Sequence, residues 1–240
     1  MILQEEITRM NWYMIESTSK WHAELAPIVQ DLQTNRHWQA LPYHTMALNR
    51  TLGSSIDDAA RMGSIFRLFV LSDHIHALVK DDNEGQVYDS ALQFHILIGD
   101  LLYGCALGLL CERGWDNLMP LIANMIVAIN EGHSLAWAKP VADPFQLATL
   151  EWGSYYRTAF SIAGLINNLQ PDMIKKLDVI GLDLGLSIVK SDVGPVNARV
   201  DFTRFQEGMN ALLSNLSVNN NYQRLDNWLA GTSLWVPAAG

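Results

Sequence analysis

The length of its helical apolar segments is what most constrains the fold of this chain. Apolar residues recur at intervals of three and four, as in Leu121, Met125 and Ile129, which places them on one face of an α-helix. Breaks at glycine and proline leave segments of roughly 15 to 28 residues, longer than the usual mean of about 11–12. No segment shows the alternation typical of a strand. The sequence therefore predicts an all-α fold of nine or ten helices.

Composition predicts one large domain. Of 240 residues, 49% are hydrophobic and 17% charged, which suits a chain with a full core. We expect a single domain over 1–240, the last ~20 residues being a tail. The net charge of −9 argues against a nucleic-acid or anionic-membrane partner. Acidic residues in the first turns argue against a signal peptide, so the expected location is the cytoplasm.

The most apolar segment is residues 91–111, ALQFHILIGDLLYGCALGLLC. Asp100 and His95 lie inside it, which favours a buried core helix over a membrane span. A buried carboxylate needs a donor, so Asp100 is satisfied by a neighbouring helix or its own N-terminal turn, or it faces a polar cavity. Gly104 and Gly108 follow at one and two turns, which would let another helix approach closely.

Residues 73–86, DHIHALVKDDNEGQ, begin like a metal site. Asp81 and Asp82 are adjacent carboxylates, but Gly85 stands where a further acid would complete the cluster. His74 and His76 are two residues apart, about 200° around a helix, so they do not form the i, i+4 chelating pair. We interpret both histidines as structural.

The order of these features resembles the trans-prenyltransferases, which join isoprenoid diphosphates. His74 precedes Asp81-Asp82 by seven residues, and Gly99-Asp100 follows. Arg157-Thr158 stands where the family has Lys-Thr, and residues 181–194, GLDLGLSIVKSDVG, stand where it has its second Asp-rich motif. The resemblance covers about residues 65 to 195 and implies a helical bundle of the isoprenoid-synthase type.

The departures from that family concern the groups that hold metal and diphosphate. Gly85 replaces the last acid of the first motif, and Asp192 stands alone in the second. The Arg-Arg pair is missing, with Lys80 the only Lys or Arg between Arg67 and Arg113. The N-terminal Gly-Gly-Lys-Arg stretch is absent too, with LNRTLGSS its nearest counterpart. Magnesium needs oxygen ligands to bridge a diphosphate, so we expect no catalysis by this chain alone.

A degenerate chain of this length resembles the small non-catalytic subunits, component 1, of heterodimeric heptaprenyl or hexaprenyl diphosphate synthases, which supply the menaquinone side chain. The resemblance implies a heterodimer with a catalytic prenyltransferase subunit through residues 91–132, including Gly104 and Gly108. It also implies that magnesium sits on the partner, that this chain has no cofactor, and that the prenyl diphosphate product lies near the interface. His74, Asp81, Asp82, Asp100, Arg157, Thr158 and Asp192 would then be vestigial motif positions.

Two alternatives remain from the residues. The chain could be a divergent magnesium-dependent prenyltransferase or terpene-processing enzyme, in which Asp81, Asp82, Asp100 and Asp192 bind the metal. It could also be an unrelated helical scaffold whose acid pairs are surface residues. Turnover by the purified chain with magnesium would favour the first alternative.

Overall fold

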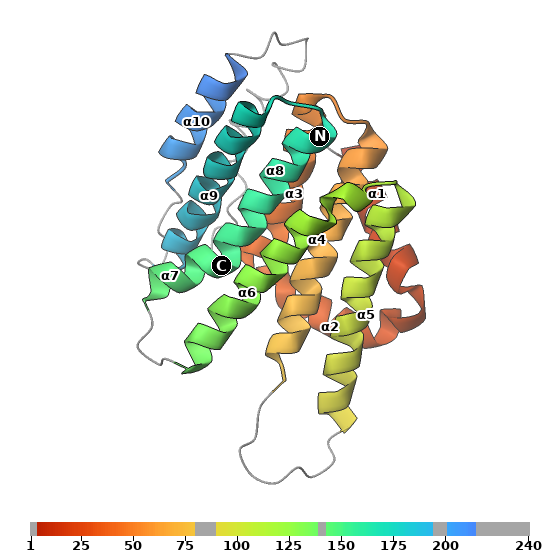
Figure 1. Ribbon diagram of the computed structural model, residues 1–240. Coiled ribbons are helices and arrows are strands. Elements are labelled where there is room, and N and C mark those ends of the chain that lie inside the picture. The colour runs from red at the N-terminus through yellow and green to blue at the C-terminus, as the bar shows by residue number, and fades with distance from the viewer. Residues whose placement is uncertain (1–3, 80–89, 139–142, 194–200, 215–240) are drawn as a thin grey trace.

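The computed structural model describes residues 4–79, 90–138, 143–193 and 201–214, and those ranges are helical throughout apart from short connections (Figure 1). They contain no strand, so the predicted all-α class is confirmed. The α-helices are α1 Gln4–Thr18, α2 His22–Asp31, α3 Arg36–Leu52, α4 Ile56–Ala77, α5 Ser90–Glu112, α6 Met119–Ala138, α7 Pro144–Ala148, α8 Ser154–Ile166, α9 Pro171–Val193 and α10 Thr203–Leu213. The predicted C-terminal tail lies outside the described residues.

Helix α4 lies at the centre of the bundle and packs against α1, α3 and α5. Helix α3 also contacts α8, which packs along α9, and α10 covers the other side of α9. The three helices α8, α9 and α10 form one side of the molecule in Figure 1. This order links the segments that carry the predicted motifs, at the end of α4, in α5, and in α8 and α9.

Local sequence fixes the starts of the two central helices. Asn35 accepts a hydrogen bond from the backbone N–H of Trp38 at 3.1 Å, and Ser55 accepts one from that of Asp58 at 3.0 Å. Both are N-caps that satisfy a backbone donor left free by the first turn. Between them, Gly53 ends α3 with φ of +110°, a left-handed conformation that glycine adopts without steric penalty.

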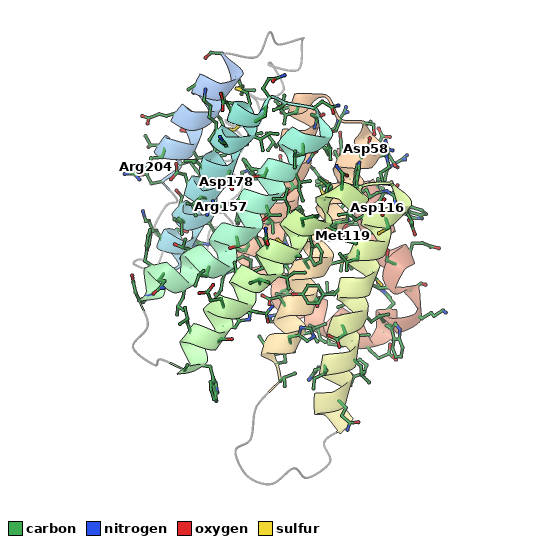
Figure 2. The ribbon with its side chains drawn as sticks, in the orientation of Figure 1. Asp58, Asp116, Met119, Arg157, Asp178 and Arg204 are labelled. Carbon is green, nitrogen blue, oxygen red and sulfur yellow. The ribbon has the colours of Figure 1, made fainter. Side chains whose placement is uncertain are left out.

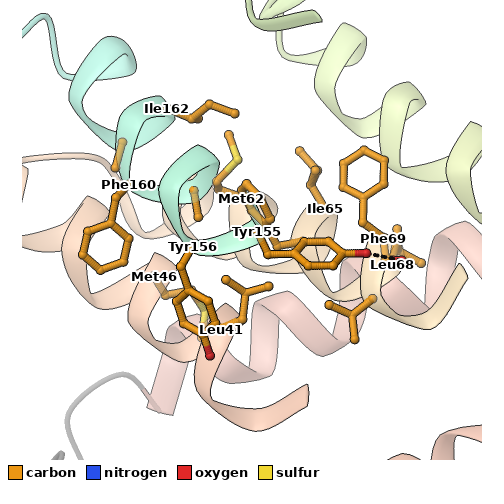
Figure 3. Close-up of a cluster of buried hydrophobic side chains, with 14 of the residues drawn as sticks. Leu41, Met46, Met62, Ile65, Leu68, Phe69, Tyr155, Tyr156, Phe160 and Ile162 are labelled. Atoms are coloured by element: carbon orange, nitrogen blue, oxygen red, sulfur yellow. Dashed lines mark hydrogen bonds between the residues drawn. The ribbon is translucent and has the colours of Figure 1, made fainter. Parts of the chain in front are cut away.

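The core is filled by large side chains from α3, α4 and α8 (Figure 3). Tyr155 and Tyr156 are fully buried between the helices, and the Tyr155 hydroxyl donates to the carbonyl oxygen of Phe69 at 3.3 Å. That bond satisfies a polar group that would otherwise be stranded in an apolar interior. The other labelled members are Leu41, Met46, Met62, Ile65, Leu68, Phe160 and Ile162.

Helix α5 is less buried than its sequence predicts. The Leu97 side chain is 69% exposed and that of Leu101 39% exposed. Within the described residues, Gln93–Glu112 is the single stretch long and apolar enough to cross a membrane by length and composition, and 33% of its most apolar window is buried in this fold. The prediction of a buried core helix was therefore wrong for one face of α5. Among the described residues, α4 covers one face of α5, and α1 adds a smaller contact.

Candidate functional site

The first predicted motif begins on the last turns of α4. His74 is half-buried there, and its burial lowers the pKa of the imidazole, with a smaller opposite effect from Asp31. Helix α4 ends at Ala77. Asp81, Asp82 and Gly85 lie outside the described residues, so the metal-binding capacity of this motif stays a sequence-based prediction.

Asp100 belongs to α5 and lies beside α4. Its carboxylate Oδ1 is 3.3 Å from His76 Nε2, while its side chain is 68% exposed. The His76 ring also stacks on Tyr103 at 5.8 Å between ring centroids. Of the environments considered for Asp100, a partner on a neighbouring helix is the one observed. The expected burial was wrong, because Asp100 lies on the uncovered face of α5.

Arg157 and Thr158 occupy the start of α8, but Arg157 already has a carboxylate partner. Its Nε and Nη2 donate to Asp178 of α9, with Nε–Oδ1 of 3.0 Å and Nη2–Oδ2 of 2.7 Å (Figure 2). This two-pronged geometry is the strongest that a guanidinium makes with a carboxylate. Thr158 is buried. Arg157, which stands at the family's Lys-Thr position, therefore links α8 to α9 by an ion pair.

Asp192 lies in the last turn of α9, and its side chain is outside the described residues. The preceding Ser191 is buried, donates to the carbonyl oxygen of Ile188 at 2.7 Å and accepts from Arg36 Nη1 at 2.6 Å. Ser191 therefore links the neighbourhood of the second motif to the start of α3.

The structure brings together three titratable residues that sequence reasoning missed, which we call the acid–histidine cluster. Asp73 Oδ1 lies 3.7 Å from His133 Nδ1, and His133 Nε2 lies 3.9 Å from Glu151 Oε1. These distances are ion-pair range but too long for direct hydrogen bonds. The imidazole of α6 therefore stands between a carboxylate of α4 and one that precedes α8.

A π-helical turn, Thr149–Gly153, positions Glu151 in this cluster. The turn presses against α6 where Gly132 has no side chain: a Cβ there would lie 2.9 Å from Glu151 Cγ. Insertions of this kind often occur at functional sites. Here the extra residue aims a carboxylate at His133.

Burial dominates the electrostatics of the acid–histidine cluster. It raises the pKa of Asp73, an effect opposed by His133 and then His76. Burial also raises the pKa of Glu151; His133 opposes this and Asp73 adds to it. The pKa of Tyr103 is raised by burial and by the nearby carboxylates of Asp73 and Asp100. Each acid is thus easier to protonate than in water.

The composition of the cluster decides what it can bind. It contains two carboxylates and one imidazole, and no Lys or Arg of the described residues takes part in the ion pairs that join them. A diphosphate would meet negative charge without a cation to receive it. Among the described residues, no group of three or more His, Cys, Asp or Glu side chains is placed to hold a metal ion.

Sequence signals for these residues existed but were weak. Asp73 is an acid in an apolar helix, the same signal that drew attention to Asp100, and it stands next to His74. His133 and Glu151 lie 18 residues apart in sequence and meet only because the π turn packs on α6. Nothing in the local pattern predicts that meeting.

Comparison with solved structures identifies the architecture. A decaprenyl diphosphate synthase from Rhodobacter capsulatus aligns with a TM-score of 0.66 and 19% identity over 79% of this chain. The chain has the fold of the trans-prenyl diphosphate synthases. It spans 62% of the length of that synthase, and at such identity the likeness establishes the fold alone.

Two further solved structures are covered over more of their own length by this chain. A polyprenyl synthase from Caulobacter crescentus, solved with calcium and isoprenyl diphosphate, aligns with a TM-score of 0.65 and 16% identity over 88% of this chain and 82% of its own. The small subunit of a geranyl diphosphate synthase from Antirrhinum majus aligns with a TM-score of 0.54 and 13% identity over 91% of this chain and 98% of its own. No family model matches the sequence, and no curated protein sequence matches it.

Proposed function

We propose that this chain is the non-catalytic subunit of a heterodimeric long-chain polyprenyl diphosphate synthase, acting in the cytoplasm. The product is a heptaprenyl or hexaprenyl diphosphate for the menaquinone side chain. The catalytic partner holds the magnesium, and this chain carries no cofactor. The shared fold and the structural likeness to a small synthase subunit from Antirrhinum majus support the proposal.

The observation that carries the proposal is apolar surface on α5 and α6 that the described residues leave exposed, which we call the α5–α6 face. On α5 it comprises Leu97, Leu101, Gly104 and Gly108, and on α6 Val127, which is 65% exposed. Large exposed apolar surfaces mark sites of association, and obligate interfaces resemble a core cut in half. A catalytic subunit of the same fold would cover this face and bring its product cavity near it.

The chemistry of the described residues agrees with a supporting role. Arg157 is paired with Asp178, and Asp100 faces solvent beside His76. The acid–histidine cluster offers no cation to a diphosphate. Each substrate of a prenyl transfer carries a diphosphate that needs metal or cationic side chains, so the partner has to supply them.

Reconstitution tests this proposal. The purified chain is mixed with a catalytic subunit that has two intact Asp-rich motifs, and products from farnesyl and isopentenyl diphosphates are measured with magnesium. We expect long-chain products from the mixture and from neither chain alone. Changing Asp81 and Asp82 together to Ala should leave most of that activity. Magnesium-dependent turnover by this chain alone, lost in that double variant, would establish the active-enzyme alternative instead.

A matched set of variants tests the α5–α6 face. Leu97→Asp and Val127→Asp each place a charge on it, whereas Val179→Asp places the same charge on α9, where Val179 is also exposed. We expect the first two to prevent complex formation in size-exclusion chromatography and the third to leave it intact. Equal behaviour of all three variants would contradict the proposed interface.

A further inference from the structure

A second region of the molecule has the properties of a ligand site. A cavity of about 620 Å³ lies between α1, α2, α3 and α4, within the usual range of small-molecule pockets. Most of its wall is apolar, formed by residues such as Met10, Met14, Leu25, Val29, Pro42 and Met46. These residues contribute neither to the acid–histidine cluster nor to the α5–α6 face, so the inference does not rest on the proposed function.

Arg67 of α4 puts a positive charge in the cavity wall. Its guanidinium carbon lies 4.5 Å from the centre of the Trp38 ring, and its Nη1 donates to Asn11 Oδ1 at 2.9 Å. Its Nε is buried without a hydrogen-bond partner among the described residues. Burial lowers the pKa of Arg67 to about 10, so it stays charged at neutral pH.

The charge of Arg67 is not balanced by the protein. Asp and Glu are absent from the residues that line the cavity, and no carboxylate pairs with Arg67 in the described part of the chain. This is unusual in a chain with a net charge of −9. A buried charge without a counter-charge is destabilising, and an anion bound beside Arg67 would relieve it.

Arg61 lies on the same helix and is an arginine whose charge is balanced by a carboxylate. Its guanidinium carbon lies 4.4 Å from the centre of the Tyr13 ring, much like Arg67 over Trp38. Unlike Arg67, it donates to Glu112 at 2.9 Å and to the Tyr13 hydroxyl at 3.0 Å. The Nε of each arginine is buried without a hydrogen-bond partner among the described residues. The two therefore differ in the counter-charge, which Glu112 supplies to Arg61, and Arg67 is the one that lines the cavity.

Neutral polar groups complete the wall. Gln39 donates to Gln33 at 3.0 Å, and Gln33 donates to the carbonyl oxygen of Val29 at 3.1 Å. Such groups can hydrogen-bond an oxygen-rich head group without adding charge. The methionines supply flexible, polarizable surface that adapts to irregular hydrocarbon.

We propose that this cavity binds an amphiphilic anion: a flexible hydrocarbon chain that ends in a phosphate or carboxylate group held by Arg67. Its volume of about 620 Å³ equals that of about twenty water molecules at ~30 Å³ each, enough for a chain of on the order of fifteen carbon atoms with its head group. An apolar wall with a single unbalanced cation matches such a molecule better than a highly charged soluble metabolite.

Calorimetric titration of the full chain with three probes tests the proposal. Farnesyl monophosphate and dodecanoate carry the two head groups, and farnesol is the neutral control. We expect at least one of the two anions to bind at a single site, at least tenfold more tightly than farnesol. The anion that binds more tightly shows whether the natural ligand carries a phosphate or a carboxylate head group. Absence of binding by both anions, or equal binding of farnesol, overturns the proposal.

Matched variants locate the site. Arg67→Met should weaken anion binding at least tenfold and change farnesol binding little, whereas Arg61→Met should leave both unchanged. Ala26→Phe narrows the cavity from its α2 wall without touching Arg67, and should weaken both kinds of probe, which covers the case in which Arg67→Met does not fold. Undiminished binding in Ala26→Phe, or equal losses in the two arginine variants, would place the ligand elsewhere.

Discussion

Two glycine pairs with identical spacing lie in opposite environments. Gly181 and Gly185 of α9 lie against α8, where a Cβ at Gly181 would be 2.5 Å from the carbonyl oxygen of Tyr156 and one at Gly185 would be 2.8 Å from its ring. A Cβ at Gly104 or Gly108 of α5 would meet no described atom within 4 Å. Because Gly181 and Gly185 have no side chain, α8 and α9 can pack closely within the chain. No helix of the described residues packs against the other pair.

The two pairs therefore distinguish a helix face that is packed, that of α9 against α8, from one on α5 that the described residues leave exposed. Helix α4 carries Asp57, Asp58, Arg61 and Arg67, and 13 of its 22 residues are nevertheless buried. Helix α5 is more apolar in sequence and keeps Leu97 exposed. The hydrophobicity of α5 therefore predicts that both of its sides are covered, whereas the described residues leave Leu97 on one side exposed.

Acid should have the largest effect, and it should act where α3 packs against α8 and α10. His37 stacks on Trp152 and lies 3.2 Å from the Tyr156 hydroxyl, while His44 packs edge-on to Phe205. Burial lowers the pKa of each to about 3. Below its unfolded value of about 6.5, each histidine takes up its proton only on unfolding, so stability falls by about 1.4 kcal/mol per pH unit per histidine between pH ~6.5 and ~3.

Urea unfolding between pH 7 and 4 measures this slope. His44→Phe should reduce this pH dependence by the contribution of one histidine, about 1.4 kcal/mol per pH unit. The raised pKa values of Asp73 and Glu151 act in the opposite direction, since their carboxyls gain protons more readily in the folded state as the pH falls. A slope that is unchanged in His44→Phe would show that His44 is not kept neutral by burial.

Gly181→Ala should be the next largest effect. The added methyl would overlap the backbone of Tyr156, which cannot rotate away, so α8 and α9 have to separate. We expect a loss of about 1–3 kcal/mol or more in the free energy of unfolding, measured by urea denaturation followed by circular dichroism. Gly208→Ala is a milder control, because its nearest neighbour is the side chain of Ile180 at 2.8 Å. A loss no greater than that of Gly208→Ala would argue against a tight α8–α9 contact.

Gly104→Ala should act in the opposite direction in the isolated chain. No described atom opposes the methyl, and alanine favours a helix over glycine by about 0.8–1.0 kcal/mol. We expect a gain of that order in the free energy of unfolding. Gly104→Leu should be tolerated by the isolated fold and should abolish assembly with the catalytic subunit. Destabilisation by Gly104→Ala would mean that α5 is already covered.

Leu97→Asp should have the smallest effect on folding. The side chain is 69% exposed, and surface changes usually alter stability by less than about 0.5 kcal/mol. The isolated chain is expected to self-associate through its uncovered apolar face, and Leu97→Asp should reduce that association in sedimentation velocity. Unchanged association together with unchanged stability would remove the α5–α6 face as the cause.

The fold was predictable because its signals are local. Spacing of apolar residues predicted the helices: Leu121, Met125 and Ile129 were expected on one face of a helix, and all three lie in α6. The order of motif positions pointed to the trans-prenyltransferase fold, which the structural comparisons support.

The candidate site was predicted only in part. Arg157 was found as a motif position, but its partner Asp178 lies 21 residues further along and shares no pattern with it. Asp100 was expected inside the protein and lies outside it. Asp73, His133 and Glu151 were missed, because three elements have to pack before those side chains meet.

By itself, the sequence determined that the chain is helical, and it showed that the motif positions depart from the family pattern at Gly85 and around Asp192. These properties depend on residue types and on spacing within a helix. Only the tertiary structure decided which glycine pair packs against another helix of the described residues. It also decided which face of α5 those residues leave exposed and which arginine lacks a counter-charge. Each of those depends on distances between residues far apart in the chain, which are set by how whole helices pack rather than by any local pattern.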